Sequence, residues 1–414
     1  MASPSSSSPT TPLLLKSPSS TSDSDFENNN NNNHHHHHHP CKVIIPMQIH
    51  KPVAILSGHV GSISSLALCG EFLLSASQSH DIIVWQHPDL RRFATFGHGH
   101  GSVKSLLALS NHVFTAHQDG HIRVWKLSRR SENLFRLLST LPTTKDYLGN
   151  FLKQSNYVQT RRHHKKLWIQ HADTISCLAV HNGVIYSGSW DKSIKVWRLS
   201  DFKCLESIKA HEDAINAVVA HKGLVYSASA DGKIKIWKKD EKKSFLHCLK
   251  GVLERNKDVS WNSVIVCEDG RRRFVYGGGS DGSVVGWEED EQQEQKEGWN
   301  LVCDINKAHE MAVLCLCSVG EMVCSGSADK SVGLWRRERG GGLVKVGVIR
   351  GHEGPVKCLQ ASRLGFGGGG EGGGGFMVYS GGLDKSLRVW WVSMESSEVK
   401  KDNDKKKDLR SLSY

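Results

Sequence analysis

Histidine, aspartate and tryptophan recur along the chain at fixed distances from one another. Histidine and aspartate beside a hydroxyl are the components of catalytic triads, in which the imidazole takes a proton from the hydroxyl. Four complete sets occur: His171, Asp191 and Trp197; His211, Asp231 and Trp237; His309, Asp329 and Trp335; His352, Asp384 and Trp390. Four identical sets are poor candidates for one active site. We therefore interpret them as structural and predict that the protein is not an enzyme.

Two glycine motifs formally match those of catalytic or nucleotide-binding sites. Residues 278–282 read GGSDG, as in a nucleophile elbow, but they lie in a strand–turn–strand pattern, whereas the elbow needs a helix after the turn. Gly365, Gly367 and Gly370 have the spacing of a dinucleotide-binding loop, but no helix pattern follows them. The eleven cysteines include no CxxC pair. We therefore predict neither a cofactor nor a metal site.

The four sets belong to a longer repeat that predicts β-strands. The segment YSGSWDKSIKVW (Tyr186–Trp197) returns in recognisable form six more times. The seven copies end at Trp85, Trp125, Trp197, Trp237, Trp287, Trp335 and Trp390. Hydrophobic and polar residues alternate in stretches such as SIKVW, and Asp-Gly or Asp-Lys pairs mark the turns, as in β-hairpins. The repeat thus indicates short strands rather than helices.

This pattern resembles the WD-repeat family, whose units of about 40 residues each form a four-stranded propeller blade. The resemblance covers residues 43–393 and implies an all-β, seven-bladed WD-repeat propeller. Residues 1–42, rich in Ser, Asn and His, are expected to form a disordered segment, and residues 394–414 a charged flexible tail. A propeller avoids open edges when one terminus completes the other's blade. We expect Pro52–Leu56 to complete the blade that ends at Trp390.

The resemblance also implies a role for the recurring polar residues. In the family, a His, a Ser or Thr, the turn Asp and the Trp form a hydrogen-bonded chain inside each blade. In the third copy Asp191 would accept from His171, and His171 would reach Ser187. The Ser187 hydroxyl would meet the indole N–H of Trp197. Such residue types suit each other, because a buried indole needs an acceptor and a buried carboxylate needs donors.

Three copies depart from this pattern. The first has Ser79 in place of the aspartate, and the second has Gly99, between His98 and His100, at the histidine position. The fifth has no histidine in register, and we expect Glu268–Arg273 to form a loop insertion there. The complete hydrogen-bonded chain is therefore predicted for the third, fourth, sixth and seventh blades.

One connection between copies is much longer than the others. It spans 46 residues from Trp125 to His171, compared with 14 after Trp197. The additional residues are about Pro142–Lys166, with a short helix expected at Lys145–Lys153. In the family this connection lies on the top rim of the propeller, where partners commonly dock.

The long connection that contains the insertion carries most of the net charge. The chain has 53 Lys and Arg against 42 Asp and Glu, a net charge of +11, and residues 126–170 hold ten basic and two acidic residues. The candidate partner-binding residues are Arg161, Arg162, Lys165, Lys166, Trp190, Asp173 and Asp213. The basic residues are compatible with a solvated loop, a docking surface for an acidic protein segment, an RNA or lipid contact, or a nuclear-import signal. The indole is either a binding hot spot or packed under the insertion, and the two aspartates are polar contacts or strand caps.

The insertion also resembles that of Jingubang-type plant WD-repeat proteins. The elements LPT, NYVQ, RRHHKK and LWxxHAD occur in the same order. This resemblance implies a noncatalytic scaffold or regulator associated with pollen germination and tube growth, which contacts other proteins in the cytoplasm and nucleus. We expect a monomeric propeller whose partner is a protein, bound through an acidic segment or acting in transcription.

Two other functions remain open from the sequence. An RNA-binding propeller would use the basic insertion. A substrate receptor of a cullin-type ubiquitin ligase would carry a WDxR motif, but no repeat tryptophan is followed by aspartate. A membrane span is not expected, because no apolar run approaches the ~18–20 residues required. Nor is a plastid location expected, because the first 22 residues hold one Lys and no Arg.

Overall fold

The fold is built almost entirely from antiparallel strands. The computed structural model describes residues 49–78, 81–97, 99, 101–128, 134–161, 164–240, 246–255, 258–290, 298–363 and 374–394, all within one compact unit, Gln48–Tyr414. The predicted segment 1–42 and residues 395–414 of the predicted tail lie outside the described residues, as do Ser79, His98, His100 and Arg162.

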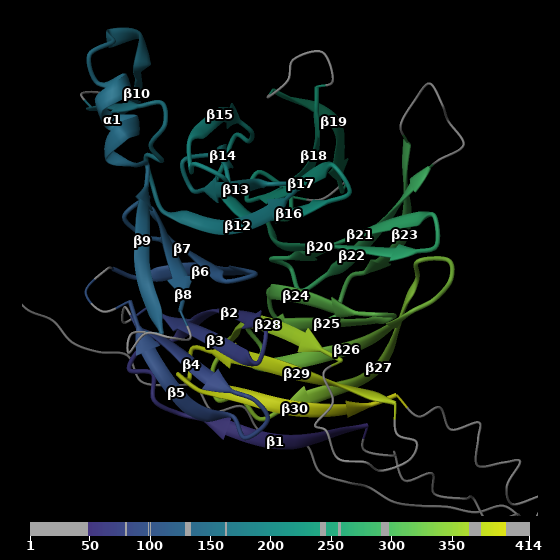
Figure 1. The fold of residues 1–414 in the computed structure, drawn as a ribbon. Coiled ribbons are helices and arrows are strands. Elements are labelled where there is room, and N and C mark those ends of the chain that lie inside the picture. Colours follow the sequence, from purple (N-terminus) through teal and green to yellow (C-terminus); the bar gives the residue numbers. More distant parts are fainter. Residues whose placement is uncertain are drawn as a thin grey trace, which may run out of the picture. The chain divides into compact units, whose positions relative to one another are not determined.

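In the described residues thirty strands form seven four-stranded sheets and one two-stranded sheet (Figure 1). Each four-stranded sheet is a blade, numbered here in chain order. Blade 1 holds β2 (Ile63–Cys69), β3 (Phe72–Ser77), β4 (Ile82–Gln86) and β5 (Arg91–Phe96); blade 2 holds β6 (Val103–Leu109), β7 (His112–His117), β8 (Ile122–Leu127) and β9 (Phe135–Leu141); blade 3 holds β12 (Ile175–His181), β13 (Val184–Ser189), β14 (Ser193–Arg198) and β15 (Cys204–Lys209). The predicted all-β, seven-bladed propeller is confirmed.

The other four blades follow the same order of strands. Blade 4 holds β16 (Ile215–His221), β17 (Leu224–Ser229), β18 (Lys233–Lys239) and β19 (His247–Glu254); blade 5 holds β20 (Trp261–Asp269), β21 (Arg272–Gly279), β22 (Val284–Asp290) and β23 (Gly298–Ile305); blade 6 holds β24 (Val313–Val319), β25 (Met322–Ser327), β26 (Ser331–Arg337) and β27 (Leu343–Arg350); blade 7 holds β28 (Val356–Ser362), β29 (Gly375–Gly382), β30 (Leu387–Ser393) and β1 (His50–Leu56).

The hydrophobic core lies between neighbouring blades rather than at one centre. Each of seven buried clusters joins residues of two adjacent blades, from blades 1 and 2 through to blades 7 and 1. The second strand of a blade is covered on both faces, and every residue of β3, β17 and β25 is buried. Each blade is thus stabilised by burying apolar area against both neighbours.

Blade 7 is completed by the N-terminal strand. β1 runs antiparallel to β30, with Pro52 opposite Trp390. The predicted closing strand Pro52–Leu56 therefore lies within β1. Ala54 and Leu56 pack on the cluster between blades 7 and 1, and Ile49 packs between blades 6 and 7.

The prediction of a loop at Glu268–Arg273 is wrong. β20 and β21 continue to their tip, where Glu268 pairs with Arg273. Charged partners on neighbouring strands explain the extension: Arg273 Nη1 lies 2.5 Å from Glu289 Oε2, and His221 Nε2 lies 2.7 Å from Glu268 Oε1. The charged side chains at this tip therefore have partners on β22 and on β16 of the adjacent blade 4, so the strands can continue to the turn.

The insertion between blades 2 and 3 has secondary structure of its own. α1 (Thr144–Asn150) begins with a capping box in which Thr143 and Asp146 satisfy each other's backbone N–H groups. A 3₁₀ turn, η1 (Gln154–Asn156), leads into a hairpin of β10 (Tyr157–Arg161) and β11 (His164–Leu167). Figure 1 shows α1 and β10 beyond the end of β9. The helix is shorter than predicted, and the sequence did not suggest the hairpin.

Candidate functional site

A chain of hydrogen bonds runs through the interior of blade 3. Trp197 Nε1 donates to Ser187 Oγ over 2.9 Å, and Ser187 Oγ lies 2.8 Å from His171 Nε2. His171 Nδ1 lies 2.9 Å from Asp191 Oδ2, which also accepts the backbone N–H of Ala172 over 2.7 Å. The chain ties the connection before β12 to the turn between β13 and β14.

Three more blades contain the same chain. Its members are His211, Ser227, Asp231 and Trp237 in blade 4; His309, Ser325, Asp329 and Trp335 in blade 6; and His352, Ser380, Asp384 and Trp390 in blade 7, with every distance between 2.7 and 2.9 Å. The structure thus brings together the residues of all four predicted sets.

Burial favours the neutral form of the imidazoles in these hydrogen-bonded chains. Burial lowers the pKa of His171 more than the Asp191 carboxylate raises it. A neutral ring that donates from Nδ1 to Asp191 accepts at Nε2 from the Ser187 hydroxyl, and Ser187 Oγ accepts from the Trp197 indole. In blade 3 each of these four side chains is hydrogen-bonded to another of the four, and Ser187 is fully buried. The arrangement is suited to holding the blade together and offers no exposed nucleophile.

Blade 2 obtains its histidine from a position that the sequence reasoning missed. His117, the last residue of β7, lies 2.7 Å from Thr115 Oγ1, which accepts the Trp125 indole N–H over 3.0 Å. Asp119 is not part of this chain; its carboxylate binds Arg123 at 2.6 Å. The sequence did hold a clue to this arrangement, because His117 comes two residues after Thr115 in a stretch that the repeat predicts to be a buried strand. In blade 1, His59, Ser75 and Trp85 form the chain without an aspartate at the Ser79 position.

Blade 5 uses an arginine where the other blades use a histidine. Arg255 Nη1 donates to Asp281 Oδ2 and to Ser283 Oγ, each over 3.1 Å, and Nη2 lies 2.7 Å from Asp304. Gly277 occupies the serine position, and a Cβ there would come within 2.9 Å of the Trp261 ring. The buried indole of Trp261 therefore fills the space of the missing side chains.

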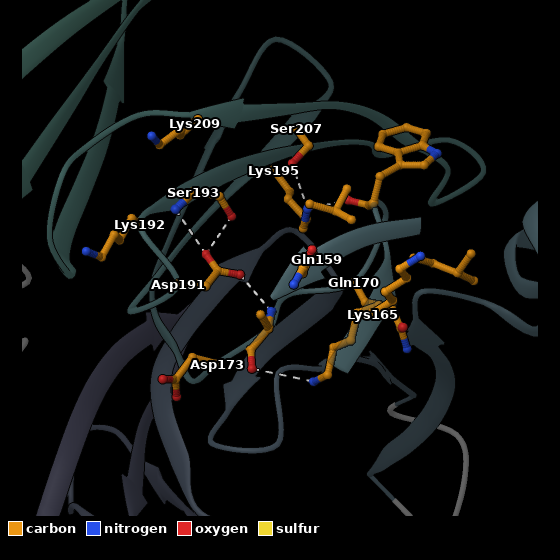
Figure 2. A pocket seen from close by; sticks show the side chains of 15 residues that line it. Gln159, Lys165, Gln170, Asp173, Asp191, Lys192, Ser193, Lys195, Ser207 and Lys209 are labelled. Atoms are coloured by element: carbon orange, nitrogen blue, oxygen red, sulfur yellow. Dashed lines mark hydrogen bonds between the residues drawn. The ribbon is translucent and has the colours of Figure 1, made fainter. Parts of the chain in front are cut away.

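The insertion and blade 3 enclose a groove of about 960 Å³. Five lysines line it: Lys165 and Lys166 from β11, Lys192 from the turn after β13, Lys195 from β14 and Lys209 from β15. Asp173 and Asp191 are also part of the lining. Figure 2 shows Lys192 and Lys209 on one side of this groove and Lys165 on the other. Sequence reasoning identified only the two lysines of the insertion, because the other three come from the repeat itself.

The remaining predicted partner-binding residues lie in turns and connections of blades 3 and 4 and at the end of β10. Trp190 is 42% exposed, and Lys104 Nζ lies 5.9 Å from its ring, so the indole is not covered by the insertion. Asp173 and Asp213 each accept the backbone N–H of the following residue, at 2.6 and 2.8 Å, as strand caps do. Arg161 is the last residue of β10 and its side chain, like Arg162, lies outside the described residues.

Neither a metal cluster nor a membrane helix is found in the described part of the chain. No group of three or more His, Cys, Asp or Glu residues there is placed to hold a metal ion. No helix among those residues has the length and apolarity to cross a bilayer.

The repeat units match the family model described as WD domain, G-beta repeat. The matched segments are residues 50–86, 91–126, 162–198, 202–238, 301–336 and 343–390, which together cover more than half of the chain. The chain belongs to the WD40 family. The segment that holds Arg255, Trp261 and Gly277 is outside these matches, in agreement with the different interior of this WD40 blade.

Curated relatives of this WD40 chain share parts of its length. It is 23% identical over 187 residues, 40% of the chain, to WD repeat-containing protein pop2 of Schizosaccharomyces pombe. It is 27% identical over 111 residues, 27% of the chain, to zinc finger CCCH domain-containing protein 59 of Arabidopsis thaliana, and 25% identical over 156 residues, 37% of the chain, to an F-box/WD-40 repeat-containing protein of that species. The alignments span 25%, 18% and 25% of these relatives, so the chain matches a quarter or less of each.

The solved structure of U3-55K has a similar fold. It aligns with a TM-score of 0.61 at 18% identity, over 83% of this chain and 98% of that one. At this level of identity the likeness concerns the propeller alone.

The buried imidazoles of this WD40 propeller predict that stability falls on mild acidification. Burial lowers the pKa of His171, His211, His309 and His352, and it lowers the pKa of His59 to about 4. Between pH 7.5 and 5 the unfolded chain gains more protons at these positions than the folded chain does, so the free energy of unfolding decreases as pH falls below about 6.5. For His59 alone the loss at pH 5 is about 2 kcal/mol.

Thermal denaturation at constant ionic strength checks this expectation, with a lower melting temperature at pH 5 than at pH 7.5. The lowered pKa of Asp231, Asp329 and Asp384 adds a further loss only below about pH 4, where unfolded carboxylates gain protons. An equal or higher melting temperature at pH 5 would contradict neutral histidines in the folded blades.

Proposed function

We propose that this chain is a noncatalytic protein-interaction scaffold whose insertion docks an acidic segment of a partner protein. The observation that carries the proposal is the combination of exposed apolar and basic side chains on the insertion. Leu148 and Leu152 are 68% and 81% exposed, and Phe151 is also exposed. Lys165 and Lys166 belong to the hairpin that follows. Exposed apolar side chains beside like charges are typical of a surface that binds a partner of opposite charge.

The insertion is held firmly enough to present such a surface. Leu167 and Ile169 are buried in the cluster between blades 2 and 3, and Tyr147 packs against it. The Gln170 amide donates to the Tyr147 hydroxyl, which joins α1 to the end of the hairpin segment. A preorganised surface loses less conformational entropy when it binds. Trp190 lies in the turn after β13, and its exposed indole, with Lys104 beside it, extends the candidate contact area.

The resemblance to Jingubang-type proteins supports a more specific role for this scaffold. In that role it acts as a regulator of pollen germination and tube growth, in the cytoplasm and nucleus, and its partner is a protein that acts in transcription. RNA binding is the other function that a basic insertion could serve, and affinity purification distinguishes the two.

A variant with Leu148, Phe151 and Leu152 all changed to Ser is expected to lose the partners that the wild type retains in quantitative affinity purification. These side chains are exposed, so the melting temperature should change little. A matched control changes three other exposed apolar residues, Leu249, Val252 and Leu301, to Ser and should keep the partners. Identical partner sets for wild type and the insertion variant would refute the docking role. Loss of bound RNA with retained protein partners would favour the RNA-binding function instead.

A further inference from the structure

The groove between the hairpin and blade 3 is formed by residues from several separate segments. Its walls include Gln159 of β10, Lys165 of β11, Ser193 of the β14 start and Ser207 of β15. With a volume of about 960 Å³, it falls within the size range of pockets that hold small molecules. Figure 2 shows residues of both the hairpin and blade 3 around this space.

The positive charge of the groove is not neutralised by its own carboxylates. Asp191 Oδ2 accepts from His171 and Ala172, and its Oδ1 accepts from Ser193 N and Ser193 Oγ at 3.0 and 2.5 Å. Asp173 Oδ1 accepts from the N–H of Thr174. Among the described residues the ion pair of a lining lysine is Lys209 with Glu212, 3.8 Å apart and largely exposed on both sides. Five lysines against two aspartates leave an excess of positive charge in the groove.

Lys195 is the most informative of these lysines. It is only 3% exposed, yet its ammonium group donates to neutral acceptors, the Trp168 carbonyl at 2.5 Å and Ser207 Oγ at 2.7 Å. An ammonium has three donors, so one donor remains. Burying a charge is costly, and burial lowers the pKa of this lysine more than the nearby Asp191 carboxylate raises it, so the charge is only partly compensated. An anion in the groove would supply both the third acceptor and the compensating charge.

Blade 4 offers an internal comparison for this lysine. Lys235 has the same position in its strand, opposite Ser227 as Lys195 is opposite Ser187. Lys235 donates to the Ala210 carbonyl at 2.8 Å and is partly exposed. Lys195 thus differs from Lys235 in its deeper burial and in its contact with the Trp168 carbonyl, which directly follows β11.

We propose that this groove binds a compact molecule carrying several phosphate groups, with the chemistry of an inositol polyphosphate. Lysines from β11, β14, β15 and the β13–β14 turn line one space, an arrangement that suits several anionic groups on one small scaffold. Lysines act as point charges that bind phosphate through charge-assisted hydrogen bonds. Ser207, Gln159 and Gln170 provide neutral polar groups for the hydroxyls of such a ligand. This inference does not depend on the protein-docking function.

Titration calorimetry of the full chain with inositol hexakisphosphate at physiological ionic strength tests the proposal. We expect one bound molecule per chain. Lys195→Met should raise the dissociation constant by about tenfold or more, because it removes one charge-assisted contact. The matched control Lys235→Met should bind like the wild type. Equal affinities of these two variants, or no binding by the wild type, would overturn the proposal.

A second pair of variants covers the case in which Lys195→Met does not fold. Lys192→Gln changes an exposed lysine at the groove, and Lys330→Gln changes the corresponding, also exposed, turn residue of blade 6, where φ is +70° compared with +73° at Lys192. Only Lys192→Gln should weaken binding. Vesicles that carry a polyphosphorylated inositol lipid form a parallel arm, and binding to them without binding of the soluble compound assigns the site to a lipid headgroup. Equal competition by inorganic sulfate or by a single-stranded RNA of the same total charge would overturn a specific polyphosphate site.

Discussion

Deletion of residues 43–57 is expected to lower the melting temperature of the propeller by roughly 5–10 °C. The deletion removes β1, which supplies the fourth strand of blade 7. Six residue pairs join β1 to β30, from His50 with Val392 to Leu56 with Leu387. Net contributions of about 1 kcal/mol for each backbone hydrogen bond make the loss on the order of 5 kcal/mol.

The apolar contacts of β1 add to this loss. Many of its side chains are exposed, including Val53 and Ile55, so the strand buries little area of its own. Ala54 and Leu56, however, pack on the cluster that joins blade 7 to blade 1, and Ile49 packs on the cluster between blades 6 and 7. Without β1 the edge of β30 and the ring of Trp390 become accessible to water, which also leaves an unpaired strand edge that favours aggregation.

Differential scanning calorimetry of the deletion variant and of a control measures the effect. The control lacks residues 2–40, a longer segment whose composition cannot build a core. It should melt within about 1 °C of the full chain, as expected for a segment whose composition contributes little to a core. If the 43–57 deletion melts together with this control, β1 does not contribute to closing the ring.

The regular part of the fold could be predicted because the repeat constrains every copy at once. The Asp and Trp positions recur with the same spacing, so the turn and the strand after it are placed in each blade, as in β13, the turn at Asp191, and β14. The hydrogen-bonded chains of blades 3, 4, 6 and 7 follow from the same spacing and the family resemblance. The closing strand also has a simple physical basis, because pairing β1 with β30 gives blade 7 its fourth strand and joins the two ends of the repeat array.

The departures could not be predicted from spacing alone. Blade 2 places an imidazole beside Thr115 from His117 on the same strand, so the histidine is two residues away rather than in the preceding connection. Blade 5 replaces an imidazole with the guanidinium of Arg255, which reaches the same turn from the end of β19. A different side chain can satisfy the same polar group, and only the three-dimensional structure shows which one does.

The groove was missed for a similar reason. The strands β10 and β11 contain charged residues without the alternating pattern that marks a strand, and the sequence between them holds no Gly or Asn to signal a hairpin. Lys195 looks like an ordinary residue of the repeat, because Lys235 has the same position in blade 4. Lys192 and Lys209 are exposed lysines of the kind found at many turns and strand ends. Their environment changes only when the insertion folds back over blade 3, a contact between segments that no local pattern records.

Trp237→Ala is expected to destabilise the protein by roughly 3–5 kcal/mol, the range for removing a large buried aromatic side chain. The indole is buried between blades 3 and 4, in one cluster with Ile215 and Val218. The replacement leaves a cavity between two blades. It also removes the indole N–H that donates to Ser227 Oγ over 2.9 Å. Ser227 keeps its contact with His211, so the main loss is apolar packing rather than an unpaired hydroxyl.

Two further variants separate packing from hydrogen bonding. Trp237→Phe keeps most of the buried ring and loses only the N–H donor, so it should cost about 1 kcal/mol plus a smaller cavity term. Trp190→Ala removes an indole of the same size from the exposed turn of blade 3 and should change the unfolding free energy by about 0.5 kcal/mol or less. Urea denaturation of the three variants gives the order Trp237→Ala, Trp237→Phe, Trp190→Ala if the interior of each blade is a packed, hydrogen-bonded unit. Equal losses for Trp237→Ala and Trp190→Ala would show instead that the repeat tryptophan contributes no more than a surface residue, and the structural interpretation of the recurring residues would fail.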